Sequence, residues 1–331
     1  MSSPAAMLPS PRVKTVRSRI DLFDLCPGSR WTAFAGLAVL AMFLPQLIAF
    51  AQFAWRNENQ SHALLIPLIS IYLGWQNRKS WRKEKQTRST APLVFLGLAL
   101  ISELMVVLLE IERVPIPLND LFSAHVTGFY CATLAILVLA FGREMLRAFA
   151  FPLAFALFSI PLPMAVLDAI EMLLQHGSAT VFAAFVHVSG VPVFREELTF
   201  ALPGMLIQIA PECSGSRSSL VLFITSLLAG YLFLRTPKHR TLLALAVIPV
   251  GILRNAIRIF LLTMLSLYVD PKLIHGPAHT AGGPPFFVLS LIPLFLLVVW
   301  FRRRENRDYL FRRSVPHANV AKAAAALPRG S

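Results

Sequence analysis

The chain is organised around a polar segment, PECSGSRSS at residues 211–219, which is followed directly by the apolar segment LVLFITSLLAGYLFL at residues 220–234. Cys213 carries the side chain closest to nucleophilic competence at neutral pH, because the pKa of a thiol is about 8.5 and neighbouring positive charge lowers it. Arg217 follows four positions later and lies on the same face if a helix begins here. A lone cysteine beside an apolar segment is more often a small buried hydrophobe, but the polar neighbours favour a chemical role.

The composition is that of an integral membrane protein. Of the 331 residues, 56% are hydrophobic and 15% are charged, which departs far from the averages of soluble proteins. A net charge of +14 would suggest nucleic-acid binding in a soluble protein, but the basic residues here occupy short segments between apolar runs, a pattern typical of membrane topology. The cysteines Cys26, Cys131 and Cys213 are too few and too scattered for a disulfide framework or a metal site. We therefore expect no metal, no cofactor and no nucleic-acid partner.

Eight apolar runs are bounded by charged residues and approach the roughly 20 helical residues needed to cross the hydrocarbon core. They cover about residues 32–54, 61–77, 91–111, 121–141, 148–170, 217–234, 241–268 and 285–301. Pro161 and Pro163 are expected to end or kink the fifth run. The predicted fold class is an all-α polytopic membrane protein with about eight transmembrane helices.

The basic loops predict how the chain is oriented. Basic residues gather in segments 12–19, 78–88, 143–147, 235–240 and 302–307, and assigning every one of them to the cytoplasm gives an alternating path without contradiction. Residues 1–31 then form a basic cytoplasmic tail, residues 32–301 the membrane domain, and residues 302–331 a second cytoplasmic tail that is basic and then disordered. Segments 55–60, 112–120, 171–216 and 269–284 face outward.

The longest outward segment, residues 171–216, predicts a small extracytoplasmic cap. Apolar side chains at helical spacing in residues 165–186 are suited to the membrane interface. Residues 190–210 combine short apolar stretches with glycine- and proline-containing turns, which predicts short β-strands. We expect this cap to place Cys213 at the outer surface of the membrane.

Two arginines lie deep within the seventh apolar run, where a central arginine costs about 2.5–3.5 kcal/mol on an insertion scale. Arg254 and Arg258 are spaced i, i+4 and share one face with Asn255 beside them, so this face is predicted to line a polar cavity. An arginine about 4 Å from the Cys213 sulfur would attract a thiolate by about 4 kcal/mol at an effective dielectric constant of 20. It could also stabilise an oxyanion, but it could not act as a base.

A general acid or base is expected from the outer loops, because imidazole titrates near neutral pH. His275 and His279 lie in the outward loop 269–284, which is predicted to be on the same side of the membrane as Cys213. His62, at the outer start of the second run, is a weaker candidate. The supporting or substrate-binding candidates also include Arg217, Arg258, Asn255, Glu212 and Ser214.

Three pieces of the sequence together resemble the exosortase/archaeosortase family. They are Cys213-Ser214-Gly215-Ser216-Arg217 at the start of a span, Arg254-Asn255-Ala256-Ile257-Arg258-Ile259 in the next span, and His279 in the following outer loop. Segments 61–67 and 161–163 are similar to further landmarks of the family, so the resemblance runs over roughly residues 30–300. Ser216 stands where an apolar residue is usual, and Pro284-Pro285 is also a departure.

This resemblance implies a cysteine peptidase or transpeptidase of the bacterial inner membrane. Family members process exported proteins that end in a Pro-Glu-Pro-type motif, one transmembrane helix and a basic tail. Cys213 would be the nucleophile, Arg254 would stabilise the thiolate and the oxyanion, and His279 would be the acid/base. His279 is preferred to His275 because Gly283 follows it at +4, as in the family's pattern. The implied partners are membrane-anchored substrate proteins, the lipid bilayer, and an amine, glycan or lipid acceptor on the outer side.

Two other classes of function are compatible with this sequence. A transporter or lipid-carrier flippase would use Arg254 and Arg258 to bind an anionic headgroup, and Cys213 would be incidental. A structural assembly subunit would depend on none of these side chains.

Overall fold

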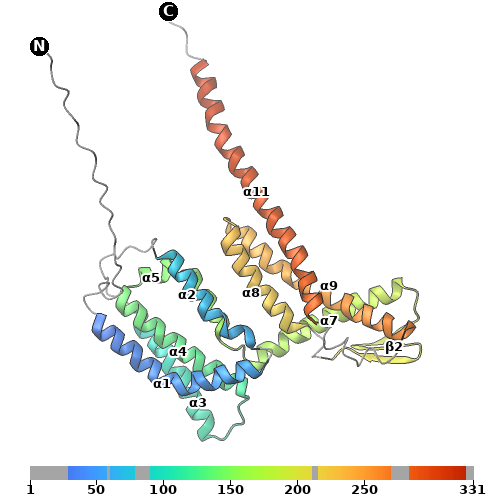
Figure 1. The fold of residues 1–331 in the computed structure, drawn as a ribbon, viewed down its shortest axis with the longest axis horizontal. Helices are drawn as coiled ribbons and strands as arrows, with labels where there is room; N and C mark the ends of the chain where they lie inside the picture. The colour runs from blue at the N-terminus through green and yellow to red at the C-terminus, as the bar shows by residue number, and fades with distance from the viewer. Residues whose placement is uncertain (1–28, 58–59, 79–89, 211–214, 270–282, 326–331) are drawn as a thin grey trace, which may run out of the picture.

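The structure is a computed structural model that describes residues 29–57, 60–78, 90–210, 215–269 and 283–325 (Figure 1). Its helices and strands follow one another in the order α1 Ser29–Arg56, η1 Ser61–Leu64, α2 Ile66–Asn77, α3 Ala91–Ile111, α4 Leu118–Phe141, α5 Glu144–Ala148, α6 Ala150–Ala156, η2 Leu157–Ser159, α7 Met164–Val188, β1 Phe194–Glu196, β2 Thr199–Leu202, β3 Met205–Gln208, α8 Ser216–Phe233, α9 Pro237–Tyr268 and α11 Gly283–Ala325.

Seven of the described helices are long and apolar enough to cross a membrane. They are α1, α3, α4, α7, α8, α9 and the part of α11 at Phe286–Tyr309. Large apolar side chains such as Leu100 and Ile101 of α3 are more than 60% exposed, as expected for surfaces that face lipid. Helices are stable in the hydrocarbon core of a membrane because each one satisfies its own backbone hydrogen bonds. The prediction of an all-α polytopic membrane fold is confirmed.

Two of the eight expected runs are built from shorter pieces. Segment 61–77 consists of the 3₁₀ turn η1 and the 12-residue helix α2. Segment 148–170 is divided between α6, η2 and the first turns of α7, because Ile160 is extended (φ −77°, ψ 124°) before Pro161 and because Pro163 caps α7. A residue before proline is pushed out of the helical region, so the two prolines separate two helices instead of kinking one.

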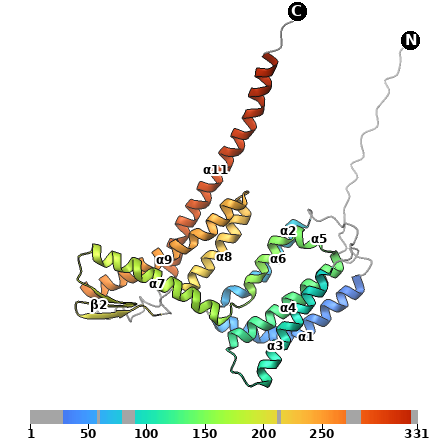
Figure 2. The same cartoon turned by 180° about the vertical axis from the view of Figure 1, so that it is seen from behind.

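The helices form two packed groups. In Figures 1 and 2, α1, α3 and α4 lie together, and α8, α9 and the first part of α11 form the other group. The second group encloses a core that includes Leu222, Leu243, Val247, Leu294 and Val298. Beyond this contact α11 continues to Ala325, whereas the sequence predicted a span ending near residue 301 and a disordered end of the chain.

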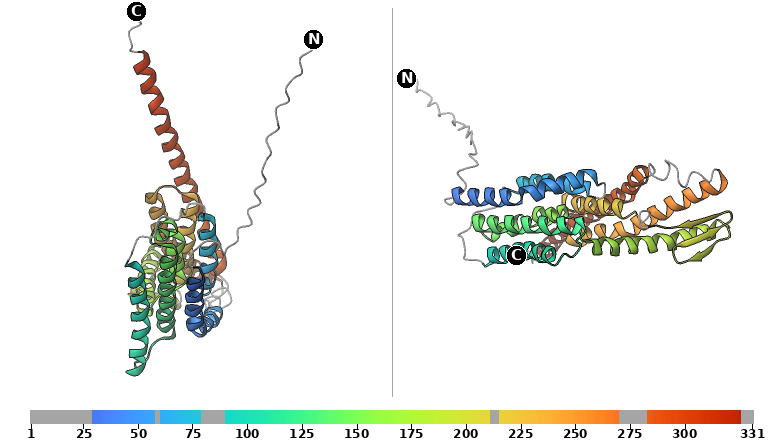
Figure 3. Two further views of the ribbon diagram at one scale, coloured as in Figure 1. Left: turned by 90° about the vertical axis from the view of Figure 1, so that its left-hand side faces the viewer. Right: turned by 90° about the horizontal axis from the view of Figure 1, so that it is seen from below.

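The three short strands form an antiparallel sheet at one end of the second group (Figure 3). Phe194 pairs with Ala201, and Phe200 pairs with Ile207. Phe200 is fully buried against Phe182 of α7, with ring centroids 4.8 Å apart, and Ala256 of α9 belongs to the same cluster. The strands expected within residues 190–210 are therefore present and rest on α7 and α9.

A buried carboxylate holds the N-terminal end of α9 in place. Glu305 of α11 is 8% exposed and accepts hydrogen bonds from the backbone N–H groups of Arg235 (2.8 Å) and Thr236 (2.9 Å). The Thr236 hydroxyl (2.5 Å) and the ring of His239 (2.9 Å) contact the same carboxylate. A negative charge at a helix N-terminus is favourable, so Glu305 joins the α8–α9 turn to α11.

Candidate functional site

Arg254 joins the middle of α9 to the start of α8. Its side chain is 7% exposed, and Nη2 donates to the carbonyl oxygen of Gly215 (3.2 Å) and to the Ser219 hydroxyl (3.4 Å). The next residue, Asn255, is 1% exposed and donates through Nδ2 to the Ser178 hydroxyl of α7 at 3.2 Å. The polar face of α9 therefore meets α7 and α8 in the interior of the molecule.

Glycines make this close meeting of three helices possible. Gly215 has φ +70°, and a Cβ atom there would lie 2.9 Å from Arg254 Nη2 and 3.1 Å from Asn255 Oδ1. A Cβ atom at Gly251 of α9 would lie 2.6 Å from the Ser219 hydroxyl, and one at Gly177 of α7 would lie 2.7 Å from Ile252 Cδ1. Small residues are the usual means by which membrane helices approach so closely.

One guanidinium nitrogen of Arg254 is not satisfied by these contacts. Nη1 is buried, and among the described residues no atom forms a hydrogen bond with it. A buried charged donor without an acceptor carries a large desolvation cost. The arrangement is thus suited to an anionic or carbonyl oxygen that approaches the start of α8. Arg258, one turn further along α9, is half-buried.

The predicted site is only partly within the described chain. Arg254, Asn255, Arg258, Arg217 and His62 are described, and the structure brings the first two together with Gly215 and Ser219. The remaining predicted site residues lie outside the described residues: Cys213, Glu212, Ser214, His275 and His279.

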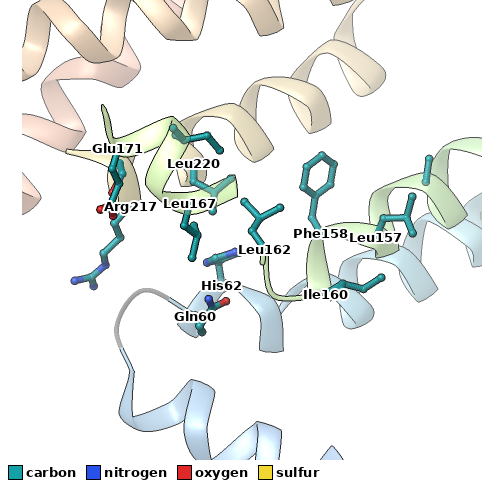
Figure 4. Close-up of a pocket in the computed structure, with 13 residues that line it drawn as sticks. Gln60, His62, Leu157, Phe158, Ile160, Leu162, Leu167, Glu171, Arg217 and Leu220 are labelled. Carbon is teal, nitrogen blue, oxygen red and sulfur yellow. The ribbon is translucent and has the colours of Figure 1, made fainter. Parts of the chain in front are cut away.

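A cavity of about 320 Å³ opens beside the start of α8 (Figure 4). It is called the outer pocket because the sequence predicts that this end of α8 faces outward. Its apolar walls come from η2, the Pro161–Pro163 turn, α7 and α8, and include Leu157, Ile160, Leu162, Leu167 and Leu220. Its polar groups are Gln60, His62, Glu171, Ser216 and Arg217. The residues that line this pocket do not include Arg254, whose guanidinium is buried in a hydrogen-bonded contact with the start of α8.

Hydrogen bonds hold the polar part of the outer pocket in place. Gln60 Nε2 donates to Asn119 Oδ1 at 2.9 Å, and Asn119 Nδ2 donates in turn to the backbone oxygen of Leu162. On the opposite side, the Ser216 hydroxyl donates to Glu171 Oε1 at 3.0 Å. The pocket therefore unites His62 and Arg217, which the sequence predicted, with Gln60, Glu171 and Ser216, which were not among the predicted site residues.

Sequence spacing gave no sign that Glu171 belongs to the site. It lies 45 positions before Ser216 on a helix whose apolar periodicity indicated only an interfacial surface. A half-buried carboxylate on a helix near the membrane could have drawn attention to it, but α7 also carries the exposed Asp168, and the sequence does not distinguish the two. Within the described ranges, no group of three or more His, Cys, Asp or Glu side chains is placed to hold a metal ion.

The fold and the site together define a polytopic α-helical membrane protein with a buried arginine where three helices converge. The chain belongs to the transmembrane exosortase family, because the family model of transmembrane exosortases matches residues 54–296. This match covers the outer pocket, the start of α8 and the polar face of α9. No curated protein and no solved structure matches the chain.

Proposed function

We propose that this exosortase is a membrane-embedded cysteine transpeptidase that removes the carboxy-terminal sorting signal of exported proteins. Cys213 is the nucleophile, Arg254 stabilises the thiolate and the developing oxyanion, and His279 transfers protons. Family membership supports a membrane protease or transpeptidase in general. The observation that carries the residue assignment is the hydrogen bond from Arg254 Nη2 to the carbonyl oxygen of Gly215.

The covalent connection between Gly215 and Cys213 supports this assignment. Two residues of extended chain span about 7 Å at most, and Arg254 Nη2 is 3.2 Å from the Gly215 oxygen. A cysteine side chain at position 213 is thus tethered within reach of the guanidinium. If the sulfur approaches to about 4 Å, the gross attraction is about 4 kcal/mol at an effective dielectric constant of 20.

The reaction proceeds in two balanced steps. The Cys213 thiolate attacks the carbonyl carbon of the scissile peptide bond, a C–S bond forms, and the C–N bond breaks while His279 gives a proton to the departing amine. The released fragment is the sorting tail, and the remaining protein is held as a thioester. An acceptor then forms a bond to the thioester carbonyl carbon and gives a proton to His279, while the C–S bond breaks and the sulfur departs as thiolate. Nη1 of Arg254 is the donor available for the oxyanion in each step.

The proposed substrate has a Pro-Glu-Pro-type motif, one transmembrane helix and a basic tail. Such a helix is already anchored in the bilayer, so it must reach the site sideways through the membrane. The proposed location is the bacterial inner membrane, with both termini in the cytoplasm and the site on the outer side. This orientation is supported by the basic segments 78–88, 143–147, 235–240 and 302–307, because loops rich in lysine and arginine usually stay in the cytoplasm.

The first prediction concerns Cys213 and Arg254. When the full chain is co-expressed with a substrate that carries such a tail, we expect Cys213→Ala to abolish processing and Arg254→Gln to lower it by at least about a hundredfold, as for the loss of an oxyanion donor. Processing is measured from the size of the substrate on immunoblots. Cys131→Ala, which changes the buried cysteine of α4, is the matched control and should leave processing intact.

The same two variants distinguish the transpeptidase from the rival function, a transporter or flippase. A transporter or flippase that binds an anionic headgroup is favoured by the orphaned Nη1 of Arg254. It would keep its activity in Cys213→Ala and lose it in Arg254→Gln. Normal substrate processing by Cys213→Ala would therefore contradict the transpeptidase mechanism.

A further inference from the structure

Glu171 places a negative charge in the outer pocket that the proposed cleavage step does not use. It is half-buried on α7, and its carboxylate accepts one hydrogen bond from Ser216 at 3.0 Å. Among the described residues, no basic side chain forms a salt bridge with it. Most of the surrounding wall is apolar, and leucine and isoleucine are its commonest residues.

A carboxylate in such a cavity favours a cationic ligand. Attraction between unit charges grows as the effective dielectric constant falls from that of water to that of a protein interior, and a few polar groups in a mostly apolar pocket are what determine its ligand. Arg217 also lines the pocket, but Figure 4 shows its side chain extending away from Leu162 and Leu167. Glu171 is therefore the charged side chain at the edge of the part of the pocket that leucines line.

The pocket lies next to the proposed nucleophile. Ser216, the hydrogen-bond partner of Glu171, follows Cys213 by three residues, which limits their Cα separation to about 10 Å. A ligand that places a cationic group at Glu171 and apolar atoms against Leu162 and Leu167 would thus lie within reach of a thioester on Cys213.

We infer that Glu171 binds the ammonium group of a primary amine acceptor, and that this amine resolves the thioester. The inference rests on the proposed function and names the acceptor class that the same site takes. The bound ammonium first gives a proton to the proposed imidazole base. The amine nitrogen then forms a C–N bond to the thioester carbonyl carbon and releases its second proton to water, while the C–S bond breaks and the sulfur departs as thiolate. Water and neutral alcohols can donate a hydrogen bond to Glu171 but carry no positive charge for the carboxylate to attract.

The test measures how the thioester divides between transfer and hydrolysis. The full chain, reconstituted in vesicles with a sorting-signal substrate, is supplied with either dansylcadaverine, a cationic primary amine, or hydroxylamine, a neutral nucleophile at pH 7.5. We expect Glu171→Gln to lower the transfer-to-hydrolysis ratio for dansylcadaverine by about tenfold, the effect of losing one hydrogen bond to a charged group. The ratio for hydroxylamine should remain close to that of wild type.

Asp168→Asn provides the matched control, because Asp168 is an exposed residue of α7 outside the pocket and its substitution removes the same charge. It should leave both ratios unchanged. A parallel fall for hydroxylamine in Glu171→Gln would show that Glu171 only fixes the start of α8, and would overturn the inference. So would a wild-type enzyme that cleaves its substrate but never transfers it to dansylcadaverine. A wild-type enzyme that does not cleave the substrate would instead contradict the proposed function.

Discussion

Gly215 is the residue on which the contact between α8 and α9 depends. Its φ of +70° disfavours any side chain, and a Cβ atom would meet Arg254 Nη2 at 2.9 Å. We expect Gly215→Ala to lower the free energy of unfolding by about 1–3 kcal/mol and to lower processing far more, because Arg254 must move. Thermal unfolding in detergent and the immunoblot assay measure the two effects.

Gly204, in the turn between β2 and β3, is the matched control for this substitution. Its φ is +79°, but a Cβ atom there would have no atom within 4 Å. Gly204→Ala should cause a similar loss of stability from backbone strain and leave processing near wild type. Equal activity of the two variants would show that the position of Arg254 does not matter for the reaction.

Some of this residue-level picture could be predicted from the sequence. The cost of a central arginine marked Arg254 as a residue with a polar partner, and the structure supplies Gly215 and Ser219 as partners. Glycine at position 215 was visible only as part of a resemblance, because a positive φ leaves no trace in hydrophobic periodicity. Glu171 was missed because its partner is distant in sequence.

Helix α9 is held between α7 and α8 through small residues on both sides. A Cβ atom at Gly177 of α7 would lie 2.7 Å from Ile252 Cδ1. We expect Gly177→Val to push α7 from α9 and to lower the free energy of unfolding by about 1–3 kcal/mol, the usual cost of overpacking. Adding Ile252→Ala should restore part of that stability, as measured by thermal unfolding in detergent.

Gly97 of α3 is a suitable control for the size of the change. A Cβ atom at this position would have nothing within 4 Å, so Gly97→Val should leave stability nearly unchanged. If Ile252→Ala gave the same increment in the presence and absence of Gly177→Val, the two side chains would not be in contact, which would contradict the packing described for α7 and α9.

The helices themselves were easier to predict than their breaks. Apolar length identified α1, α3, α4, α8 and α9 within a few residues, because a span needs about 20 apolar residues whatever it packs against. The same criterion joined α6, η2 and the start of α7 into one run. Composition counts apolar residues, whereas the separation depends on the backbone conformation that Pro161 and Pro163 impose.

At the scale of the whole molecule, the orientation of the chain remains a prediction that labelling can test. Cysteines introduced at Ser189, after α7, and at Arg307, on α11, both occupy exposed positions. In a chain whose native cysteines are replaced, we expect a membrane-impermeant maleimide to label position 189 in intact cells and position 307 only after permeabilisation, because basic loops stay in the cytoplasm. Labelling of position 307 in intact cells would show that the chain has the opposite orientation to the predicted one.

Helix α9 has 32 residues, so it is about 48 Å long at 1.5 Å per residue. The Glu305 carboxylate holds one of its ends, and the sheet rests near the other. Arg254 therefore lies at a fixed position along α9, roughly 26 Å from the start of the helix at Pro237. Under the proposed function, the substrate has to bring its scissile bond to the depth of Arg254 in the membrane, so the length of the substrate's own transmembrane helix becomes part of what the enzyme recognises.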